Sequence, residues 1–585
     1  MPFPLNSAAL QVRSVAPQES VPSSPTSPDE LVSRSPVLSA NTPLGQTLNQ
    51  TPPRIRNYFE TCASLVRNYL PNFSRPNGVP VATFNTQDSY QACTANRLNQ
   101  LLQRLQFENI NASFNQRAHG IQTVYEDSPE TVRQALRAST TLTSDQKNML
   151  RFFMYGEALS ASELSKIFEG DYSNLIDQLS GLGIVVTETR RGETFYRLNN
   201  LSVESRRFSN GQTMFLLSEL PADFRHDHGQ STAMISSTSF TLLHRIEQSY
   251  SSGNLRGVIA DFGSGNGIQA IALLMMNPGI EEALALEVDP ASMNLNRWNA
   301  MLNGVGNRIQ VIDNSDADPS HARETQAFDR ALRGRCLSLA VSNPPFNTVP
   351  YSVNEIFPSF GAGGEHGLNI TNLFLWQALP YLTGQAEFLF YSQLAETDQE
   401  PRHLFLEESF GREGAHSRGF NVDIQRANFE IFNYGRNEYA DILLRILPHF
   451  PHDESIPLPD RTQLIAEMRA SHVGALRPAY VSIRPSASAT QASTIRMSTA
   501  HIIPLENAYR RERQAPAPAP AQTGGIYEVE TIRPAGEIIT QIQAPEQRGG
   551  VFLQFHQVMP NGSDVIRDER RLEELLRQIE NHPSD

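Results

Sequence analysis

Residues 257–276, GVIADFGSGNGIQAIALLMM, constrain the fold of this chain most strongly. An apolar, strand-like run ends at Asp261. Three glycines, Gly263, Gly265 and Gly267, follow before an apolar helical pattern begins. Glycine is needed where the backbone turns with a positive φ and a ligand must approach without a Cβ in the way. With the free N–H groups and positive dipole end of the helix, the turn forms a seat for a carboxylate or phosphate.

Strand-like and helix-like segments alternate from about residue 211 to 450, which is typical of βαβ units around a mostly parallel sheet. The glycines are spaced G-x-G-x-G, and Ile268 stands where a dinucleotide-binding turn has its third glycine. The pyrophosphate-binding pattern is therefore not met. We predict an α/β, Rossmann-like fold that binds a different ligand at this turn.

Acidic residues follow the next two strand-like segments. The strand predicted in the run EALALEV ends at Glu287, whose carboxylate can accept hydrogen bonds from two ribose hydroxyls. Asp289 and Pro290 are explained as the N-cap and first residue of a helix. After the run RIQVID, either Asp316 or Asp313 could accept a hydrogen bond from an adenine amino group.

The stretch LAVSNPPFNTVP ends a further strand-like run with an amide, two prolines and an aromatic ring. The carboxyl ends of parallel strands face the ligand crevice, so these side chains should lie beside the glycine turn. Asn343 offers an amide oxygen, and Pro344 offers a carbonyl whose direction is fixed by the neighbouring prolines. Two such acceptors can hold both hydrogens of a planar –NH₂ group, while Phe346 can stack on a flat substrate.

Orientation and polarisation of this kind allow a poor nucleophile to attack a methyl group without a strong base. A β-turn would explain an isolated Asn-Pro-Pro. It does not explain Asn-Pro-Pro after a glycine turn and an acid-tipped strand in this order, so we predict a catalytic role for Asn343, Pro344 and Phe346.

The segment from Asp261 to Gly267, Glu287 and the NPPF motif together resemble class I S-adenosylmethionine-dependent methyltransferases that methylate amino groups. The runs DFGSGNGIQAIALL and GAGGEHGLN look like the glutamine methyltransferases of peptide-chain release factors and their relatives with an N-terminal winged-helix-like domain. The resemblance implies S-adenosyl-L-methionine as the cofactor and a class I methyltransferase domain. It implies substrate contacts at Asn343, Pro344 and Phe346 and cofactor contacts at Asp261, Gly263, Gly265, Gly267 and Glu287, to which we add Asp316 and Asn343 as predicted cofactor contacts.

The methyl acceptor is left open by the motif. Glutamine methyltransferases usually have Tyr where Phe346 stands, and Phe is found there in several ribosomal-RNA guanine methyltransferases. The net charge of −14 is the wrong sign for binding nucleic acid over the whole surface. We therefore prefer a protein substrate with a glutamine-like amide slightly over an RNA base; a protein that keeps the fold but acts only by binding is the third alternative.

Metal and membrane partners are not expected. The three cysteines, Cys62, Cys93 and Cys336, are too far apart for a disulfide framework or a Cys-based zinc site. The HDH run at 226–228 lacks a third separate ligand. The first residues lack a charged segment followed by an apolar one, and no 18 consecutive residues are apolar, so we expect a cytoplasmic protein. Nothing in the pattern predicts an oligomeric state.

The choice of basic residues is unusual. Lys147 and Lys166 are the only two lysines among 48 basic residues, although the chain has 39 asparagines, whose codons share their first two letters with those of lysine. Arginine keeps positive charge, whereas lysine is also a target of ubiquitination and acetylation. We hypothesise that the protein works where lysine modification would harm it, for example as an effector delivered into the cytosol of a host cell; the alternative is drift in composition without a function.

The N-terminal half is predicted in three parts. Residues 1–55 are rich in Pro and Ser and read as a disordered leader, and residues 56–140 show helical periodicity. Residues 141–210 contain two short helical patterns and then a hairpin signal around RRG, the order of a winged helix. The hairpin arginines could contact nucleic acid, but a docking domain with a solvated rim is the favoured interpretation; these arginines are Arg190, Arg191 and Arg197.

The predicted methyltransferase domain occupies residues 211–450. Residues 451–513 are predicted as an extension, residues 514–525 as a Pro/Ala linker, and residues 526–585 as a tail that ends in a short amphipathic helix.

Overall fold

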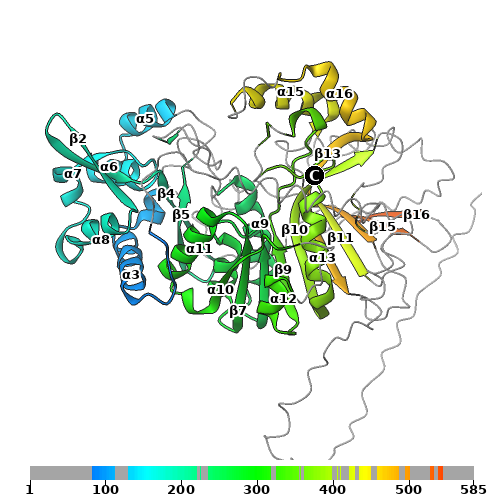
Figure 1. Cartoon of the computed structure of the whole chain (residues 1–585), viewed down its shortest axis with the longest axis horizontal. Coiled ribbons are helices and arrows are strands. Elements are labelled where there is room, and N and C mark those ends of the chain that lie inside the picture. Colours follow the sequence, from blue (N-terminus) through cyan, green and yellow to red (C-terminus); the bar gives the residue numbers. More distant parts are fainter. Residues whose placement is uncertain are drawn as a thin grey trace, which may run out of the picture.

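Figure 1 shows the computed structural model of the chain. The structure describes residues 82–111, 129–220, 224–225, 235–317, 325–354, 356–357, 361–397, 405, 409, 420–427, 434–449, 457–485, 495–500, 527–532 and 538–543. The predicted leader, the Pro/Ala linker and the C-terminal amphipathic helix lie outside these residues.

A single large sheet forms the centre of the molecule, with strand order β14-β11-β13-β10-β9-β6-β7-β8 and β12 paired to β13. Five neighbouring strands, β10, β9, β6, β7 and β8, run parallel, and β13 runs antiparallel to both β10 and β11. The α/β class with a mostly parallel sheet, predicted from the sequence, is therefore confirmed. The strands are β6 (Gly257–Phe262), β7 (Ile280–Glu287), β8 (Ile309–Asp313), β9 (Leu337–Ser342), β10 (Leu382–Thr397), β11 (Phe420–Ala427), β12 (Tyr434–Gly435), β13 (Val473–Pro485) and β14 (Ile495–Ala500).

The order of the strands reverses between β6 and β9. From β6 the chain winds outward through β7 to β8, and it then returns to the other side of β6 to form β9 and β10. In a doubly wound sheet, ligands bind outside the carboxyl ends of the strands at such a reversal. β13 is inserted antiparallel beside β10. The reversal brings the glycine turn and the NPPF motif close together, as the resemblance to class I methyltransferases implies.

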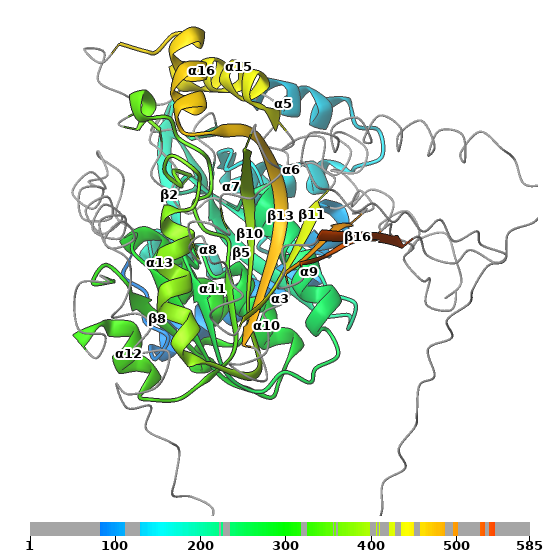
Figure 2. The same ribbon diagram turned by 90° about the vertical axis from the view of Figure 1, so that its right-hand side faces the viewer.

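Helices cover both faces of the sheet (Figure 2). On one face, Leu242, Ile271 and Ala300 pack in a buried cluster with Leu339 and Val341 of β9. A second cluster fills the other face and includes aromatic residues of the helices there. The helices of the first face are α9 (Ser237–Tyr250), α10 (Ile268–Met276) and α11 (Pro290–Leu302), and those of the second are α12 (Ala327–Leu332) and α13 (Asn369–Ala378).

The N-terminal region forms a small helical unit with its own three-stranded antiparallel sheet of order β1-β3-β2. The helix, helix and hairpin order predicted from the sequence is present, and a capping box of Ser160 and Glu163 begins the first of these helices. The hairpin turns at Arg191 and Gly192, whose φ values of 53° and 82° suit a tight primed turn. The elements are α3 (Ser89–Arg104), α5 (Pro129–Ala138), α6 (Ser144–Phe153), β1 (Leu159–Ser160), α7 (Ala161–Ser165), α8 (Leu175–Gly181), β2 (Val185–Arg190) and β3 (Glu193–Leu198).

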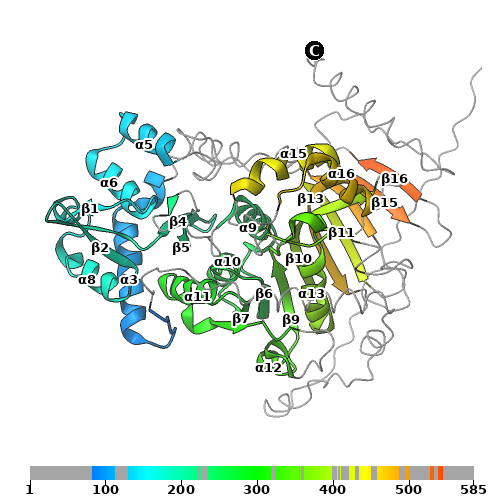
Figure 3. The same ribbon diagram turned by 45° about the horizontal axis from the view of Figure 1, so that its top comes forward.

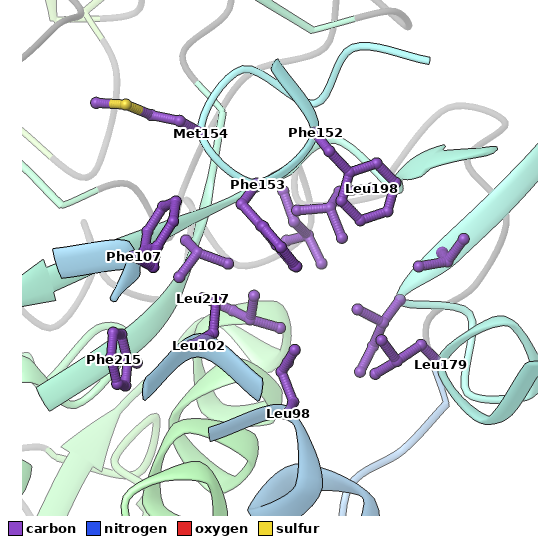
Figure 4. Packing of buried hydrophobic residues seen from close by; sticks show 14 of the residues in the cluster. Leu98, Leu102, Phe107, Phe152, Phe153, Met154, Leu179, Leu198, Phe215 and Leu217 are labelled. Atoms are coloured by element: carbon purple, nitrogen blue, oxygen red, sulfur yellow. The ribbon is translucent and has the colours of Figure 1, made fainter. Parts of the chain in front are cut away.

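This unit shares a hydrophobic core with the methyltransferase domain. Side chains of α3, α6, α8 and β3 converge, and residues of the strand β5 (Thr213–Glu219) join them (Figure 4). The cluster continues into α11 through Leu295 and Trp298, and the Trp298 ring lies 4.8 Å from that of Phe84. The two parts are therefore packed together and not merely linked.

A hairpin of β4 (Leu201–Arg207) and β5 (Thr213–Glu219) connects the two parts. Asn299 on α11 bonds both backbone groups of Leu217, at 2.7 and 2.9 Å, and Asn303 does the same for Phe215. The predicted boundary between residues 210 and 211 falls inside this hairpin. A break there is wrong, because β4 and β5 are paired strands of one element.

The sheet also continues past residue 450, the predicted end of the methyltransferase domain. β13 begins at Val473, within the predicted extension, yet it lies between β10 and β11. The segment before β13 carries α15 (Arg436–Ile446) and α16 (Arg461–Ala470), which lie beyond one end of β10 and β13 (Figure 3). The domain boundary is thus corrected: the helices are an insertion between two strands of the sheet.

The remaining described elements are short. β15 (Tyr527–Ile532) and β16 (Ile538–Gln543) form a separate antiparallel pair. The 3₁₀ turns are η4 (Gly170–Tyr172), η6 (Gly306–Arg308), η8 (Tyr351–Val353), η9 (Leu379–Tyr381) and η12 (Leu447–His449). None of the helices in the described residues combines the length and apolarity needed to span a membrane.

Candidate active site

The turn between β6 and α10 requires glycine in the way the sequence predicted. Gly263, Gly265 and Gly267 have φ values of 65°, 52° and 89°. A Cβ on Gly267 would lie 2.6 Å from Oδ1 of Asn296, so a side chain is excluded on that side. A Cβ on Gly265 would meet no described atom within 4 Å, so the turn is open there. The backbone of Gly265 is thus approachable by a ligand.

Asp261 lies fully buried at the end of β6. Its Oδ2 accepts a hydrogen bond from the backbone N–H of Ala270 in the first turn of α10, at 3.1 Å. Its Oδ1 is buried and has no partner among the described residues. Burial raises the pKa of Asp261 to about 8, and the nearby Glu287 carboxylate adds to the shift. A cationic ligand group beside Asp261 would favour its ionised form and so oppose both shifts.

Glu287, at the end of β7, reaches back to the glycine turn. Its Oε2 accepts from the N–H of Gly265 at 2.7 Å, and its Oε1 accepts from the N–H groups of Val288 and Asp289. Burial raises the pKa of Glu287, although these three N–H groups oppose the shift. Since each carboxylate oxygen has about two acceptor sites, Oε2 retains one for a ligand hydroxyl. Accepting from a second hydroxyl requires the carboxylate to give up one backbone bond.

Asp316 is placed differently from the other predicted cofactor residues. It is exposed, and its Oδ2 accepts from the N–H of Ala327 at the start of α12, with Arg330 at 3.5 Å. It therefore supports the N-terminus of α12. The alternative, Asp313, is also exposed and accepts from the N–H of Ser315. The structure gives each of these carboxylates a local role and does not bring either into contact with the glycine turn.

Asn343 lies beside the glycine turn because Ser342, the residue before it, pairs with Phe262 across β9 and β6. Its Nδ2 donates to the hydroxyls of Thr238 and Ser239, at 3.2 and 3.1 Å. Its Oδ1 is buried without a partner in the described part of the chain. The amide oxygen is therefore left as an acceptor; that it binds an –NH₂ group of a substrate stays a prediction. Pro344 follows and is buried.

Phe346 is positioned for packing. Only 8% of it is exposed, and its ring lies edge-on against Tyr391 of β10 at 5.3 Å. The structure thus supports the ring as part of the wall of the site and does not show it with a free face. Stacking on a flat substrate stays a prediction.

A glycine-rich loop at residues 361–369 supports the segment after NPPF. The N–H of Gly363 donates to the carbonyl of Asn347 at 2.9 Å, and the N–H of Asn347 donates to the carbonyl of Gly361 at 3.0 Å. Gly367, with φ of 73°, lies so close to the carbonyl oxygen of Phe346 that any Cβ would overlap it. The later GAGGEHGLN run therefore holds the backbone of the motif in place.

The insertion between β11 and β13 holds the same segment from the other side. The hydroxyl of Tyr439 on α15 donates to the carbonyl of Thr348 at 2.8 Å. Glu467 on α16 accepts from the N–H and the hydroxyl of Ser352, at 3.0 and 2.9 Å. Val349 and Val353 pack in a buried cluster with both helices. These contacts between α15, α16 and the segment after NPPF were not predicted from the sequence.

Sequence reasoning also missed three side chains near Asn343. Thr238 and Ser239 contact its amide, but the run SSTS reads simply as the start of a helix. Tyr391 is level with Asn343, because Phe390 pairs with Ser342, and its buried hydroxyl has no partner among the residues described. No local pattern marks these residues, because their contacts join segments about 50 to 105 positions apart.

Residues 236–329 match the family model of ribosomal protein L11 methyltransferase (PrmA). Over 95 residues the chain is 32% identical to the ribosomal protein L11 methyltransferase of Shigella sonnei, which is 16% of this chain and 30% of the relative. It is 37% identical over 76 residues to that of Haemophilus influenzae, 13% of this chain and 25% of the relative. The chain thus spans less than a third of the length of these relatives.

The match supports a methyltransferase and implies S-adenosylmethionine as the cofactor, as the sequence predicted. It includes the start of α9, the glycine turn and Glu287, and it ends 14 positions before Asn343. It therefore concerns the cofactor side of the site and not the residues predicted to hold the methyl acceptor.

Solved structures with a similar arrangement include a SAM-dependent methyltransferase from Agrobacterium tumefaciens, at 9% identity and a TM-score of 0.26, covering 53% of this chain and 79% of that chain. A tRNA methyltransferase from M. jannaschii has 12% identity and a TM-score of 0.24, covering 54% and 67%. The fold rests on the strand order described above.

The residues present fit S-adenosylmethionine. The cofactor is a cation with carboxylate, amino and ribose hydroxyl groups, and the site offers an open backbone turn at Gly265 together with a buried oxygen that lacks a partner in the described residues, Oδ1 of Asp261. Glu287 offers its remaining acceptor site beside them. No group of three or more His, Cys, Asp or Glu side chains in the described residues is arranged to hold a metal ion.

Proposed function

We propose that this protein is an S-adenosylmethionine-dependent N-methyltransferase that acts on a planar amide or amine nitrogen. The observation that carries the proposal is the amide of Asn343. Its –NH₂ end is held by two hydroxyls and its buried oxygen is left without a partner, beside a glycine turn suited to the cofactor. Cofactor binding alone requires no such acceptor at the end of β9.

Each residue has a proposed role. Bound S-adenosylmethionine supplies the electrophilic methyl group. Oδ1 of Asn343 and the carbonyl of Pro344 accept the two hydrogens of the acceptor –NH₂ group and so direct its lone pair. Asp261 and Glu287, with the turn at Gly265, hold the cofactor. Phe346 limits the site, and Asp316 is a weaker candidate for the adenine contact.

A protein substrate with a glutamine-like amide is preferred. The chain carries a net charge of −14. On the hairpin of the winged-helix-like unit, Glu188 forms an ion pair with Arg190, and its carboxylate lies 3.9 Å from Nε of Arg197. The guanidinium of Arg190 also lies over the ring of Phe195. The hairpin charge that would attract a phosphate backbone is thus partly neutralised. This supports a docking role for the unit.

Methylation of an RNA base is the second candidate. It is favoured by Phe346 in the motif and by Arg191, which is exposed at the tip of the hairpin. The same pair of acceptors can hold an exocyclic –NH₂ group of a base.

A third candidate is a host-directed protein that binds the cofactor without catalysis. The scarcity of lysine favours this candidate. The free acceptor at Asn343 argues against loss of catalysis. Adding surface lysines and measuring the half-life in eukaryotic cells tests the delivery hypothesis, which predicts faster turnover of the lysine-rich variant.

The test of function is transfer of labelled methyl from S-adenosylmethionine into bacterial and eukaryotic lysates, which are then divided between protease and nuclease. We expect protease treatment to remove the incorporated methyl label. Label removed by nuclease would favour the RNA base, and no label with cofactor binding intact would favour the non-catalytic protein. The matched control is Asn343→Ala, which should bind cofactor nearly as well as the wild type but transfer at least about 100-fold more slowly.

A further inference from the structure

Three hydroxyl side chains gather at the start of α9. Ser236 is the N-cap, and its Oγ accepts from the backbone N–H of Ser239 at 3.4 Å. The same Oγ lies 2.7 Å from the hydroxyl of Thr238 and 3.2 Å from that of Ser239. Thr238 and Ser239 are 6% and 8% exposed. Because Ser236 already caps the helix, the cap does not explain why two more hydroxyls are buried here.

Both of these hydroxyls contact one side chain on a distant strand. Nδ2 of Asn343 donates to Thr238 and to Ser239, which uses both of its hydrogens. A hydroxyl oxygen has two lone pairs, so Thr238 and Ser239 can each accept from the amide whichever member of the pair with Ser236 is the donor. Turning the amide end for end would require both hydroxyls to change from acceptors to donors, at least one of them at the expense of its hydrogen bond to Ser236. The amide oxygen is then held on the opposite side, where it has no partner within the described chain.

We propose that Thr238 and Ser239 are positioning residues that fix the orientation of the Asn343 carboxamide, so that its oxygen and not its nitrogen faces the methyl acceptor. The inference rests on the proposed function. It follows from the geometry that an amide turned end for end would put a donor where the –NH₂ group of the substrate needs an acceptor. The two hydroxyls thereby contribute to selecting a substrate nitrogen that carries hydrogens.

The alternative is that the hydroxyls only pack α9 against the sheet. Apolar side chains already pack α9, and the residue just before it, in a buried cluster; they are Ile235, Leu242, Leu243 and Ile246. A packing role predicts that the isosteric change Thr238→Val is harmless to transfer, because volume and branching are kept. A positioning role predicts that it is not.

The experiment compares the double variant Thr238→Val, Ser239→Ala with the conservative variant Thr238→Ser, which keeps both hydroxyls. Selective ¹⁵N-asparagine labelling reports the side-chain amide of Asn343, assigned by its absence in Asn343→Ala. We expect hydrogen exchange of this amide to speed up at least tenfold in the double variant and to change little in Thr238→Ser. Calorimetry should find cofactor affinity in the double variant within about threefold of the wild type.

Transfer is measured on the same proteins with the acceptor found in the lysates. We expect kcat to fall at least tenfold in the double variant, and each single variant, which keeps one bond, to lie between. Unchanged exchange protection in the double variant would overturn the proposal, as would a kcat equal to that of the wild type. If the double variant does not fold, the single variants decide by the same two measurements.

The two proposals fail in different ways. A wild type that binds cofactor but methylates nothing contradicts the proposed function, whereas the exchange of the Asn343 amide still decides whether Thr238 and Ser239 hold it. A wild type that transfers methyl, with a double variant that transfers equally well, contradicts only the positioning role.

Discussion

Two carboxyl groups within one hydrogen-bonded turn give the site its electrostatics. Asp261 is fully buried, and the carboxylate of Glu287, which is bound to the glycine turn through Gly265, makes Asp261 harder to ionise by raising its pKa further. Within the described residues, both carboxylates accept hydrogen bonds from backbone N–H groups and not from positive side chains. This pair of carboxyl groups is suited to bind a cationic ligand.

The raised pKa of Asp261 predicts how stability depends on pH. An unfolded Asp titrates near pH ~3.9, whereas in the folded protein burial raises the pKa of this group to about 8. The native state therefore holds the proton more tightly. The contribution is complete below pH ~4 and is lost as pH rises through about 8, at up to about 1.4 kcal/mol per pH unit.

Asp261→Asn should remove that slope, because the amide does not titrate. Urea unfolding at several values between pH 5 and pH 8, without cofactor, measures the free energy of unfolding of both proteins. The raised pKa of Glu287 adds a slope of the same sign to each. Equal pH dependence in wild type and variant would contradict the assignment.

Glu287→Ala should weaken binding of S-adenosylmethionine by about 1.5–3 kcal/mol, the usual range for hydrogen bonds to a charged group. Part of the loss is indirect, since the carboxylate also orders the N–H of Gly265. Glu287→Gln is the matched control: it keeps one side-chain oxygen and should lose less. Calorimetry that finds no change in Glu287→Ala would place the ribose site elsewhere.

At the scale of elements, the glycine-rich loop and the NPPF segment act as one structure. Gly367→Ala places a Cβ against the carbonyl oxygen of Phe346, at a φ of 73°. Gly334 has a similar φ of 75°, but a Cβ there meets no described atom within 4 Å. Gly334→Ala should therefore cost only the conformational penalty of about 1–2 kcal/mol. Gly367→Ala should cost roughly 1–3 kcal/mol more, because the Phe346 peptide must move.

Denaturant unfolding of both variants measures this difference, and methyl transfer should fall only in Gly367→Ala. Equal losses of stability would mean that the two loops are not coupled.

The elements that local sequence predicts well are those whose cause is local. The strand, glycine turn and helix at residues 257–276 were predicted because positive-φ glycines and apolar runs lie together in the chain. β13 was missed for a physical reason. Pro478 lies within it, and a proline without an N–H argues against a central strand, while its partners in β10 lie some 85 positions away. Pairing over that distance leaves no local signal.

The same division applies to the site. The carbonyl-end position of Asn343 follows from the βαβ order, so it could be predicted. The hydroxyls that hold its amide come from α9, and the ring of Tyr391 that covers Phe346 comes from β10. Burial of Phe346 was therefore not visible in the motif, where a free aromatic face and a packed one look alike.

At the scale of the whole molecule, additions on both sides hold the site. On one side the N-terminal unit packs on α11, where Asn299 bonds both Leu217 of the connecting hairpin and the carbonyl of Asn266 in the glycine turn. On the other, α15 and α16 hold the loop after NPPF through Thr348 and Ser352. The cofactor turn and the acceptor loop are thus each attached to a part outside the parallel sheet.

This arrangement predicts that the N-terminal unit and the methyltransferase domain unfold together. Trp298 is fully buried in their shared core, so Trp298→Ala should lower the free energy of unfolding by about 3–5 kcal/mol. Hydrogen exchange in increasing denaturant measures the protection of α3 and of β9 separately. Both should be lost at one denaturant concentration in the wild type and at one lower concentration in the variant, because neither side of the core remains packed without the other. Loss of protection in α3 well before β9 in the wild type would show two independent units, and Asn299 could then not transmit the state of the N-terminal unit to the glycine turn.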